Sequence, residues 1–237
     1  MKRREFLAGT AALGVALAVS RRSTGAPAKV GAGKLEPPPK GDMPVAVAIS
    51  EGATMIDFAG PWEVFQDVHV PDRGSTMEEI MPFRLYTVSE STAPVRGSGG
   101  IRLVPDYAFT NAPAPRVVVV PAQRGSAALH EWLRKMVGKA DVVMSVCTGA
   151  FQLGRAGLLS GLDATTHHDS YDAFEKAFPD VRLHRGVRFV ENARISTAGG
   201  LSSGIDLALR VVERYFGRPA AERTAAYMEY QGKGWIA

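Results

Sequence analysis

The sequence predicts an α/β protein in which helices cover both faces of a mostly parallel β-sheet. Short apolar runs alternate with helical patterns along the chain, which is the arrangement that gives such a sheet. Four consecutive valines, Val117 to Val120, are typical of a buried central strand. A further apolar strand runs directly into Cys147, and a helical pattern begins immediately after it, as in a nucleophile elbow. The 237 residues fit one domain with appendages.

Each element follows from local pattern and turn residues. We expect strands, in chain order, at residues 45–49, 83–88, 101–104, 117–120, 141–146, 164–167, 187–190 and 194–197, the last two as a hairpin. We expect helices at 62–68, 126–137, 148–159, 170–178 and 201–216, and one from Pro219. Gly60-Pro61 should open the first helix, because proline is tolerated in a first turn. Ligands of such sheets bind beyond the carboxyl ends of the strands, so the loops there should carry the chemistry.

The N-terminal segment resembles an export signal. Lys2, Arg3 and Arg4 precede a mild apolar run over residues 7–19, which is shorter than the roughly 20 residues that cross a bilayer. The string Arg3-Arg4-Glu5-Phe6-Leu7 resembles a twin-arginine signal, and Ala26-Pro27-Ala28 has the form of a cleavage site. We therefore expect residues 1–28 to direct export to the periplasm or outside the cell, with no stable membrane anchoring after cleavage. A disordered basic tail is the alternative.

The rest of the chain divides into a linker and a domain. Residues 29–42 contain three consecutive prolines and several glycines, as in a linker, and residues 43–237 form the domain. The first 28 residues contain five basic and one acidic side chain, and the whole chain contains 28 and 24. The remainder therefore has 23 of each sign and no net charge. Because a nucleic-acid surface needs excess basic charge on the domain itself, we expect no nucleic-acid partner.

Cys147 is the single cysteine of the chain, so it cannot form an internal disulfide. At a strand-to-helix turn its side chain would project from the carboxyl edge of the sheet, next to helix N–H groups that favour a thiolate. We therefore expect Cys147 to be a reactive thiol. The alternative is a buried structural cysteine, which is common among cysteines in general.

Several separated motifs resemble the DJ-1/PfpI superfamily, and most closely its isonitrile hydratase-like branch. The motifs are Cys147-Thr148-Gly149-Ala150, Gly157-Leu158-Leu159, Ala164-Thr165-Thr166-His167, the segment from Asp57 to Phe65, Phe178-Pro179-Asp180-Val181 and the segment from Thr197 to Asp206. The resemblance covers residues 43–230 and implies a flavodoxin-like three-layer sandwich, which is usually a homodimer. It also implies that Cys147 attacks a small-molecule substrate with no metal or organic cofactor.

The resemblance implies two partners for the thiol. Asp57, expected in the loop after the first strand, would handle protons; its alternative role is to form a turn or cap a helix. His167 would lower the pKa of the thiol or shuttle a proton, or would be an ordinary polar residue at a strand end. His168 stands where the branch usually has tryptophan, which would reshape the pocket. Neighbours on a strand point to opposite faces, so we expect no metal site at these histidines.

The anionic intermediate needs hydrogen-bond donors. The backbone N–H groups of Cys147 and Thr148, with Gly149 allowing close passage, are the candidates. The family has a Gly-Gly-x-Gly loop where this chain has Ala122-Gln123-Arg124-Gly125, so a residue there that needs a positive φ would be strained. Arg124 would add a cation at the rim or be solvated. The glycines at 199, 200 and 204 are expected to serve close packing, because they lack the context of a phosphate-binding motif.

The resemblance favours a cysteine-dependent enzyme that hydrates an isonitrile to an N-substituted formamide. The alternatives are a non-enzymatic redox or ligand sensor, and a glyoxalase-type or amidase activity. Activators with this domain also carry a helix-turn-helix region, for which the sequence after the domain leaves no room. We therefore do not expect a transcription factor.

Overall fold

The computed structural model describes residues 28–29 and 32–236, and its centre is an eight-stranded sheet. The strand order is β1-β11-β12-β8-β7-β2-β3-β6, and every neighbouring pair is parallel except β11 and β12. The strands are β1 (Ala28–Lys29), β2 (Met43–Ala48), β3 (Phe83–Ser89), β6 (Tyr107–Ala108), β7 (Val117–Val120), β8 (Val142–Val146), β11 (Phe189–Glu191) and β12 (Ile195–Ala198). The predicted mostly parallel sheet is confirmed.

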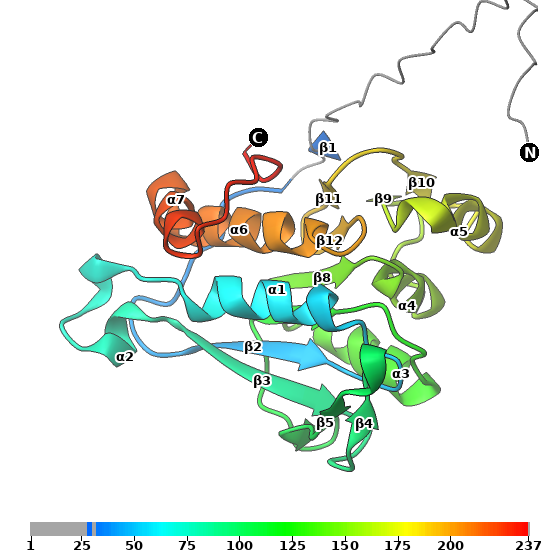
Figure 1. Cartoon of the computed structure of the whole chain (residues 1–237), viewed down its shortest axis with the longest axis horizontal. Helices are drawn as coiled ribbons and strands as arrows, with labels where there is room; N and C mark the ends of the chain where they lie inside the picture. Colours follow the sequence, from blue (N-terminus) through cyan, green and yellow to red (C-terminus); the bar gives the residue numbers. More distant parts are fainter. Residues whose placement is uncertain (1–27, 30–31, 237) are drawn as a thin grey trace, which may run out of the picture.

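Helices cover both faces of this sheet, which gives three layers (Figure 1). One face packs against α1 (Met55–Gln66), α6 (Ser203–Phe216) and α7 (Arg218–Tyr227), and the other against α3 (Ala127–Met136), α4 (Gly149–Arg155) and α5 (Tyr171–Ala177). The smaller elements are α2 (Met77–Ile80), β4 (Val95–Arg96), β5 (Arg102–Leu103), β9 (Asp163–Ala164), β10 (Arg182–Leu183) and the 3₁₀ turns Pro71–Arg73, Ser98–Gly100 and His168–Ser170.

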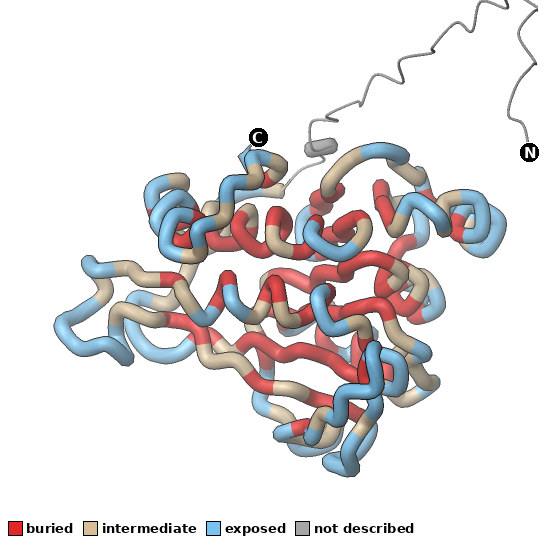
Figure 2. The backbone as a smooth tube through the Cα atoms, in the orientation of Figure 1, coloured by how far each residue is buried: buried red, intermediate tan, exposed pale blue. Residues whose placement is uncertain are grey.

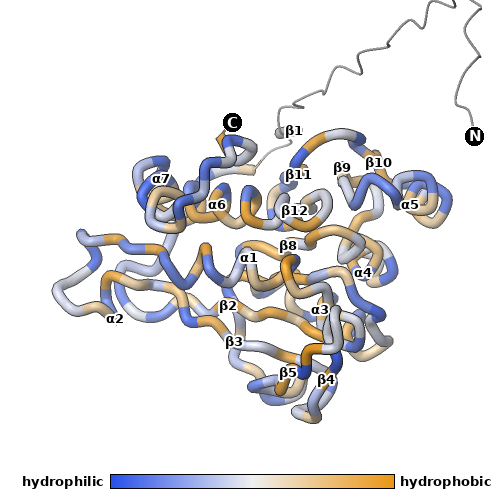
Figure 3. Tube along the Cα trace, viewed as in Figure 1, coloured by the Kyte–Doolittle hydropathy of each residue, from blue (hydrophilic) through white to orange (hydrophobic). Residues whose placement is uncertain are grey.

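The central strands are buried (Figure 2) and largely hydrophobic (Figure 3), because their side chains alternate between two cores. In β7, Val117 and Val119 belong to the core under α1 and α6, whereas Val118 and Val120 belong to the core under α3 and α4. A strand covered on both sides needs apolar residues at every position. This explains the run of four valines, whose predicted bounds are those observed.

The first helix begins earlier than predicted. Helix α1 starts at Met55 and contains Pro61 in its interior, so the expectation that Gly60-Pro61 opens it was wrong. Packing explains the tolerance of proline there: α1 lies against α6, and Pro61 is buried where α6 presents Gly204, which has no side chain. Two other expected segments are shorter than predicted: α4 ends at Arg155, and the strand expected at 164–167 consists of Asp163 and Ala164. The hairpin of β11 and β12 is confirmed.

The segment predicted as a linker follows the surface of the domain. The Leu35 N–H donates to the Arg214 carbonyl at 2.9 Å, and the Arg214 guanidinium donates back to the Gly33 carbonyl at 3.0 Å. Arg73 donates to the carbonyls of Pro38 and Gly41 at 2.6 and 2.9 Å. Residues 32–42 therefore form a strap held at two places. The predicted export signal lies almost entirely outside the described residues and stays a prediction.

Among the residues that the structure describes, no helix combines the length and the apolar character needed to cross a bilayer.

Candidate active site

Cys147 occupies the sharp turn between β8 and α4. Its φ is +58°, a region that few residues other than glycine adopt and that recurs at functional sites. Two hydrogen bonds hold this backbone: the Cys147 N–H donates to the Gly199 carbonyl at 2.8 Å, and the Thr166 hydroxyl donates to the Cys147 carbonyl at 3.0 Å. The predicted nucleophile elbow is present, and its thiol is nearly buried, with the residue 7% exposed.

Gly149 makes the tight approach between α4 and the end of β7 possible. A Cβ atom at this position would lie 2.1 Å from the Val120 carbonyl oxygen and 2.9 Å from the Pro121 carbonyl oxygen. Because both neighbours are backbone atoms, they cannot move aside cheaply. Glycine therefore lets α4 start directly behind Cys147.

Asp57 lies beside the thiol, in the first turn of α1 and not in a loop as predicted. Its carboxyl is fully buried; Oδ2 accepts the Ala122 N–H at 3.0 Å, while Oδ1 has no hydrogen-bond partner by standard geometry. Burial raises the pKa of Asp57 to about 6, although the Ala122 amide, the Cys147 thiol and the Leu201 amide all act to lower it. The carboxyl is thus a buried proton acceptor directed toward the sulfur.

The helix N-terminus favours a thiolate, but other groups at the site outweigh it. Burial, and then the negative charge of Asp57, raise the pKa of Cys147 to about 11. The Thr148 N–H and hydroxyl and the Leu201 N–H act in the opposite direction but are outweighed. At neutral pH the resting site therefore contains a protonated thiol beside a mostly ionised carboxyl group.

Leu201 supplies a donor that the sequence did not indicate. One predicted donor, the Cys147 N–H, is engaged with the Gly199 carbonyl, and in the loop after β7 the Ala122 N–H donates to Asp57. The N–H groups of Thr148 and Leu201 are the ones that act on the sulfur. Leu201 has a φ of +52°, which is unusual for a bulky residue and turns the chain at the start of α6. No local sequence signal marks this conformation.

The loop after β7 is not strained at the positions where strain was expected. Among the described residues, the positive φ in this loop belongs to Gly125, at +73°, and Ala122 and Gln123 do not have one. Gln123 donates its side-chain amide to the Ala48 carbonyl at 2.9 Å and accepts the Gln152 amide on its own carbonyl at 2.9 Å. The substitution of the two family glycines is therefore accommodated by an ordinary backbone and two side-chain hydrogen bonds.

The two histidines are placed differently from the prediction. His167 packs its ring against Gly200, where a Cβ would lie 2.3 Å from the ring, and its Nδ1 accepts the Asp169 N–H at 3.2 Å. The groups that shift the pKa of Cys147 do not include His167. His168 is mostly exposed and pairs with Asp169 at 3.0 Å, so its ring points to solvent. Close packing is confirmed for Gly200, and for Gly204 against Val146.

The expectation that His167 and His168 point to opposite faces of a strand was wrong. His167 and His168 are not strand neighbours but enter a 3₁₀ turn, where their ring centroids lie 4.4 Å apart. With Asp169 they present ligand atoms within 4.8 Å of one another. His168 and Asp169 are exposed, and Nδ1 of His167 is already a hydrogen-bond acceptor. A protein zinc site normally has at least three committed ligands, so we propose no metal here.

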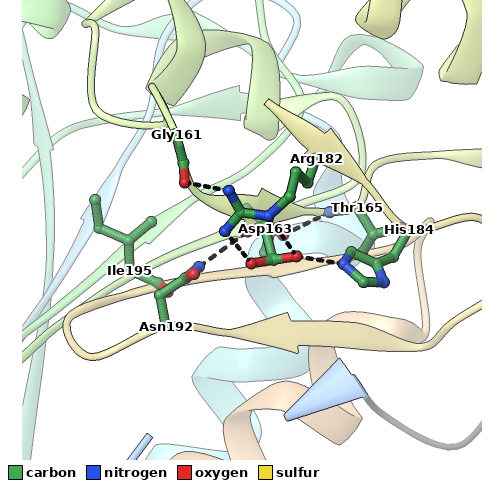
Figure 4. Close-up of polar contacts among 8 residues, drawn as sticks. Gly161, Asp163, Thr165, Arg182, His184, Asn192 and Ile195 are labelled. Carbon is green, nitrogen blue, oxygen red and sulfur yellow. Dashed lines mark hydrogen bonds and ion pairs between the residues drawn. The ribbon is translucent and has the colours of Figure 1, made fainter. Parts of the chain in front are cut away.

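A charged cluster behind the site fixes the segment that leads to Thr166 (Figure 4). Asp163 accepts two hydrogen bonds from Arg182, at 3.2 and 2.6 Å, and lies 2.6 Å from Nε2 of His184. The hydrogen bonds from Arg182 are the main reason that the pKa of Asp163 lies below its usual value. Asn192 donates to the Asp163 carbonyl at 2.9 Å. These bonds tie β9 to β10 and to the residue that follows β11, and so hold the segment that leads to Thr166, whose hydroxyl donates to the Cys147 carbonyl.

The Asp57→Asn variant is expected to be more stable than the wild type at pH 8, by about 2 to 3 kcal/mol. The unfolded carboxyl ionises near pH 3.8 and the folded one near 6, and each pKa unit corresponds to about 1.4 kcal/mol. Between these values the unfolded state binds fewer protons, so wild-type stability falls as pH rises and then becomes level above about pH 7. Urea denaturation of both proteins at pH 4, 6 and 8 measures the difference.

Glu63→Gln, on the exposed side of the same helix, is the matched control and should show no such trend. A difference between Asp57→Asn and wild type that stays constant from pH 4 to 8 would contradict the raised pKa.

Known proteins resemble this chain over most of the domain. A sequence model of the DJ-1/PfpI family matches residues 43–214. The isonitrile hydratase of Pseudomonas putida is 31% identical over 182 residues, which is 74% of this chain and 73% of the hydratase. The HTH-type transcriptional regulator GbdR of Pseudomonas aeruginosa is 32% identical over 152 residues, which is 62% of this chain and 40% of the regulator.

Solved structures agree with this fold. A ThiJ/PfpI family protein from Pseudomonas syringae is 26% identical, with a TM-score of 0.70 over 81% of this chain and 76% of that one. Drosophila melanogaster DJ-1beta is 15% identical, with a TM-score of 0.66 over 81% of this chain and 100% of that one. The second likeness concerns the fold alone.

Proposed function

Because this chain belongs to the DJ-1/PfpI family, we propose that it is a cysteine-dependent enzyme that adds water to an isonitrile and releases an N-substituted formamide. The similarity to the Pseudomonas putida hydratase supports the substrate class. Cys147 is the proposed nucleophile, and Asp57 is the group that moves protons. The reaction needs neither a metal nor an organic cofactor.

The observation that carries the proposal is the unpaired Oδ1 atom of Asp57. An unpaired buried carboxylate oxygen is costly, and it belongs to a carboxyl group that interacts with the protonated thiol of Cys147. This arrangement suits a nucleophile that loses its proton only as it attacks. An isonitrile fits, since its terminal carbon accepts both the nucleophile and the proton.

The proposed reaction consists of two additions. First, the sulfur bonds to the terminal carbon of R–N≡C, and the thiol proton passes through Asp57 to the same carbon, which gives R–N=CH–S–Cys147. Water then adds to that carbon while Asp57 takes one of its protons, and the nitrogen gains a proton. Finally, the C–S bond breaks, and R–NH–CHO leaves as the thiol is restored. The Thr148 and Leu201 N–H groups stabilise the negative charge that develops on sulfur.

A non-enzymatic sensor is the second candidate, because some relatives are transcriptional regulators. This chain spans about two fifths of their length. A redox sensor needs an accessible thiol with a low pKa, whereas Cys147 is nearly buried and has a raised pKa. The site therefore favours the enzyme over the redox sensor.

The purified protein, incubated with a simple alkyl isonitrile, is expected to produce the matching formamide with multiple turnovers, followed by NMR or chromatography. A 2-oxoaldehyde and a primary amide serve as alternative substrates. Turnover of either one without isonitrile turnover would replace the proposal with a glyoxalase-type or amidase activity. No turnover of any substrate, together with rapid peroxide oxidation of the thiol, would favour the sensor.

We also propose that the enzyme is exported and works as a homodimer. Export rests on the twin-arginine-like string at Arg3-Arg4, and N-terminal sequencing of material from the periplasm or medium tests it. Dimerisation rests on the family resemblance and on the exposed apolar side chains of Met55, Ile56 and Leu201. Light scattering that gives the mass of one chain would contradict it.

A further inference from the structure

A hollow lies at the carboxyl edge of the sheet, and the thiol does not line it. It has a volume of about 430 Å³ and is lined by residues that follow β7, β2 and β3, which are neighbours in the sheet. Its lining comes from the loops after these strands, from Phe109 and from the start of α3. Along the chain, β2 is followed by β3, which lies on one side of β2 in the sheet. Strand β7 comes later and lies on the other side of β2. The hollow therefore lies at the point where the strand order reverses, the place where open α/β sheets bind ligands.

Three charged side chains line this hollow: Glu51 accepts the Arg96 N–H at 3.0 Å, whereas Arg124 and Glu90, which are exposed and of opposite charge, are unpaired. Arg124 follows β7 and Glu90 follows β3. Neither side chain forms a hydrogen bond or an ion pair with another residue in the described part of the chain. A guanidinium in a concave site binds a carboxylate well, and a free glutamate binds an ammonium group. The two charges thus suit one ligand that carries both.

The remaining lining supports a short ligand with an aliphatic body. Phe109, Leu129 and Val95 give apolar wall surface. Ser126 lines the hollow and is the N-cap of the ten-residue helix α3, and a helix N-terminus adds a favourable field for the carboxylate next to Arg124. The volume lies within the range typical of small-molecule sites.

We propose that this hollow binds a small zwitterion, with its carboxylate on Arg124 and its ammonium group on Glu90. The site is distinct from the thiol, because neither Cys147 nor Asp57 lines it. The two sites share loops, however. Two hydrogen bonds connect the loop after β7 with the loop after β2. The Arg124 N–H donates to the Glu51 carbonyl at 2.9 Å, and the Thr54 N–H donates to the Ala122 carbonyl at 2.9 Å.

Calorimetric titration of the full chain with unbranched ω-amino acids, from glycine to 6-aminohexanoate, tests the proposal. We expect affinity to peak at one chain length, since the two charges are fixed in the protein. At that length, the matching carboxylate without the amine and the matching amine without the carboxylate should each bind at least about 10-fold more weakly. Arg124→Gln and Glu90→Gln should each weaken binding of the zwitterion by a similar factor.

Two control variants locate the binding. Arg134→Gln removes an exposed charge from α3 outside the hollow and should leave the affinity unchanged, as should Cys147→Ala. The proposal is overturned if no member of the series binds, if the simple carboxylate binds as well as the zwitterion, or if Arg124→Gln has no effect. Loss of binding in Cys147→Ala would also overturn it, because the ligand would then occupy the thiol site. Each of these results leaves the proposed isonitrile hydration untouched.

Discussion

Replacing Cys147 by alanine is expected to lower isonitrile turnover at least about 1,000-fold. The sulfur forms the bond to substrate in the proposed reaction. Alanine removes this atom but keeps the Cβ. Formamide production by the variant and the wild type, measured at equal protein concentration, gives the ratio.

Cys147→Ser is the stricter comparison, because a hydroxyl fills nearly the same space but is a much weaker nucleophile. It should also lose most of the activity. If either variant keeps more than a tenth of the wild-type rate, Asp57 would be activating water directly and the thiol would not be the nucleophile. A third variant, Cys147→Gly, measures the backbone strain at this position separately from catalysis. Because the φ of residue 147 is +58°, which glycine adopts without strain, the free energy of unfolding of Cys147→Gly should be about 1 kcal/mol higher than that of Cys147→Ala.

Gly149→Ala is expected to destabilise the protein by more than about 3 kcal/mol, or to prevent folding. The added Cβ would lie 2.1 Å from the Val120 carbonyl oxygen. Relief would require α4 to move away from the end of β7, which would also displace the elbow that holds Cys147. Urea denaturation followed by circular dichroism measures the loss, and soluble yield reports a variant that does not fold.

Gly138→Ala is the matched control, since a Cβ there would meet no atom within 4 Å and its φ is not positive. It should change the free energy of unfolding by less than about 1 kcal/mol. A loss below 1 kcal/mol for Gly149→Ala as well would show that the start of α4 adapts, and that the close approach is not a constraint on the elbow.

The parts of the fold that could be predicted are those in which local pattern and burial agree. The valines of β7 have β-propensity and are buried on both faces, so their bounds were predicted correctly. Helix α1 was misplaced because proline was treated as a helix start, whereas packing of Pro61 beside Gly204 permits it inside. The short strands β9 and β10 were missed as a pair, since Asp163 and Arg182 are brought together by the fold and not by sequence spacing.

The candidate site, like the fold, could be predicted only in part. The elbow at Cys147 could be predicted because an apolar strand leads directly into it. The raised pKa of its thiol could not, because it depends on burial and on Asp57, which lies 90 positions away in the sequence. The Leu201 amide could not be predicted either, since leucine has no tendency toward a positive φ and only the turn into α6 imposes it.

The raised pKa of Cys147 has a consequence for how such a protein is detected. Proteome-wide surveys with iodoacetamide-type labels report cysteines in proportion to their thiolate fraction and accessibility. With a pKa of about 11, less than about one Cys147 in a thousand would be thiolate at pH 7.5, and the side chain is nearly closed to reagents. A survey of this kind would rank the residue among inert cysteines. Probes that resemble the substrate would reach the sulfur by the same route as the substrate, and they would identify Cys147 instead.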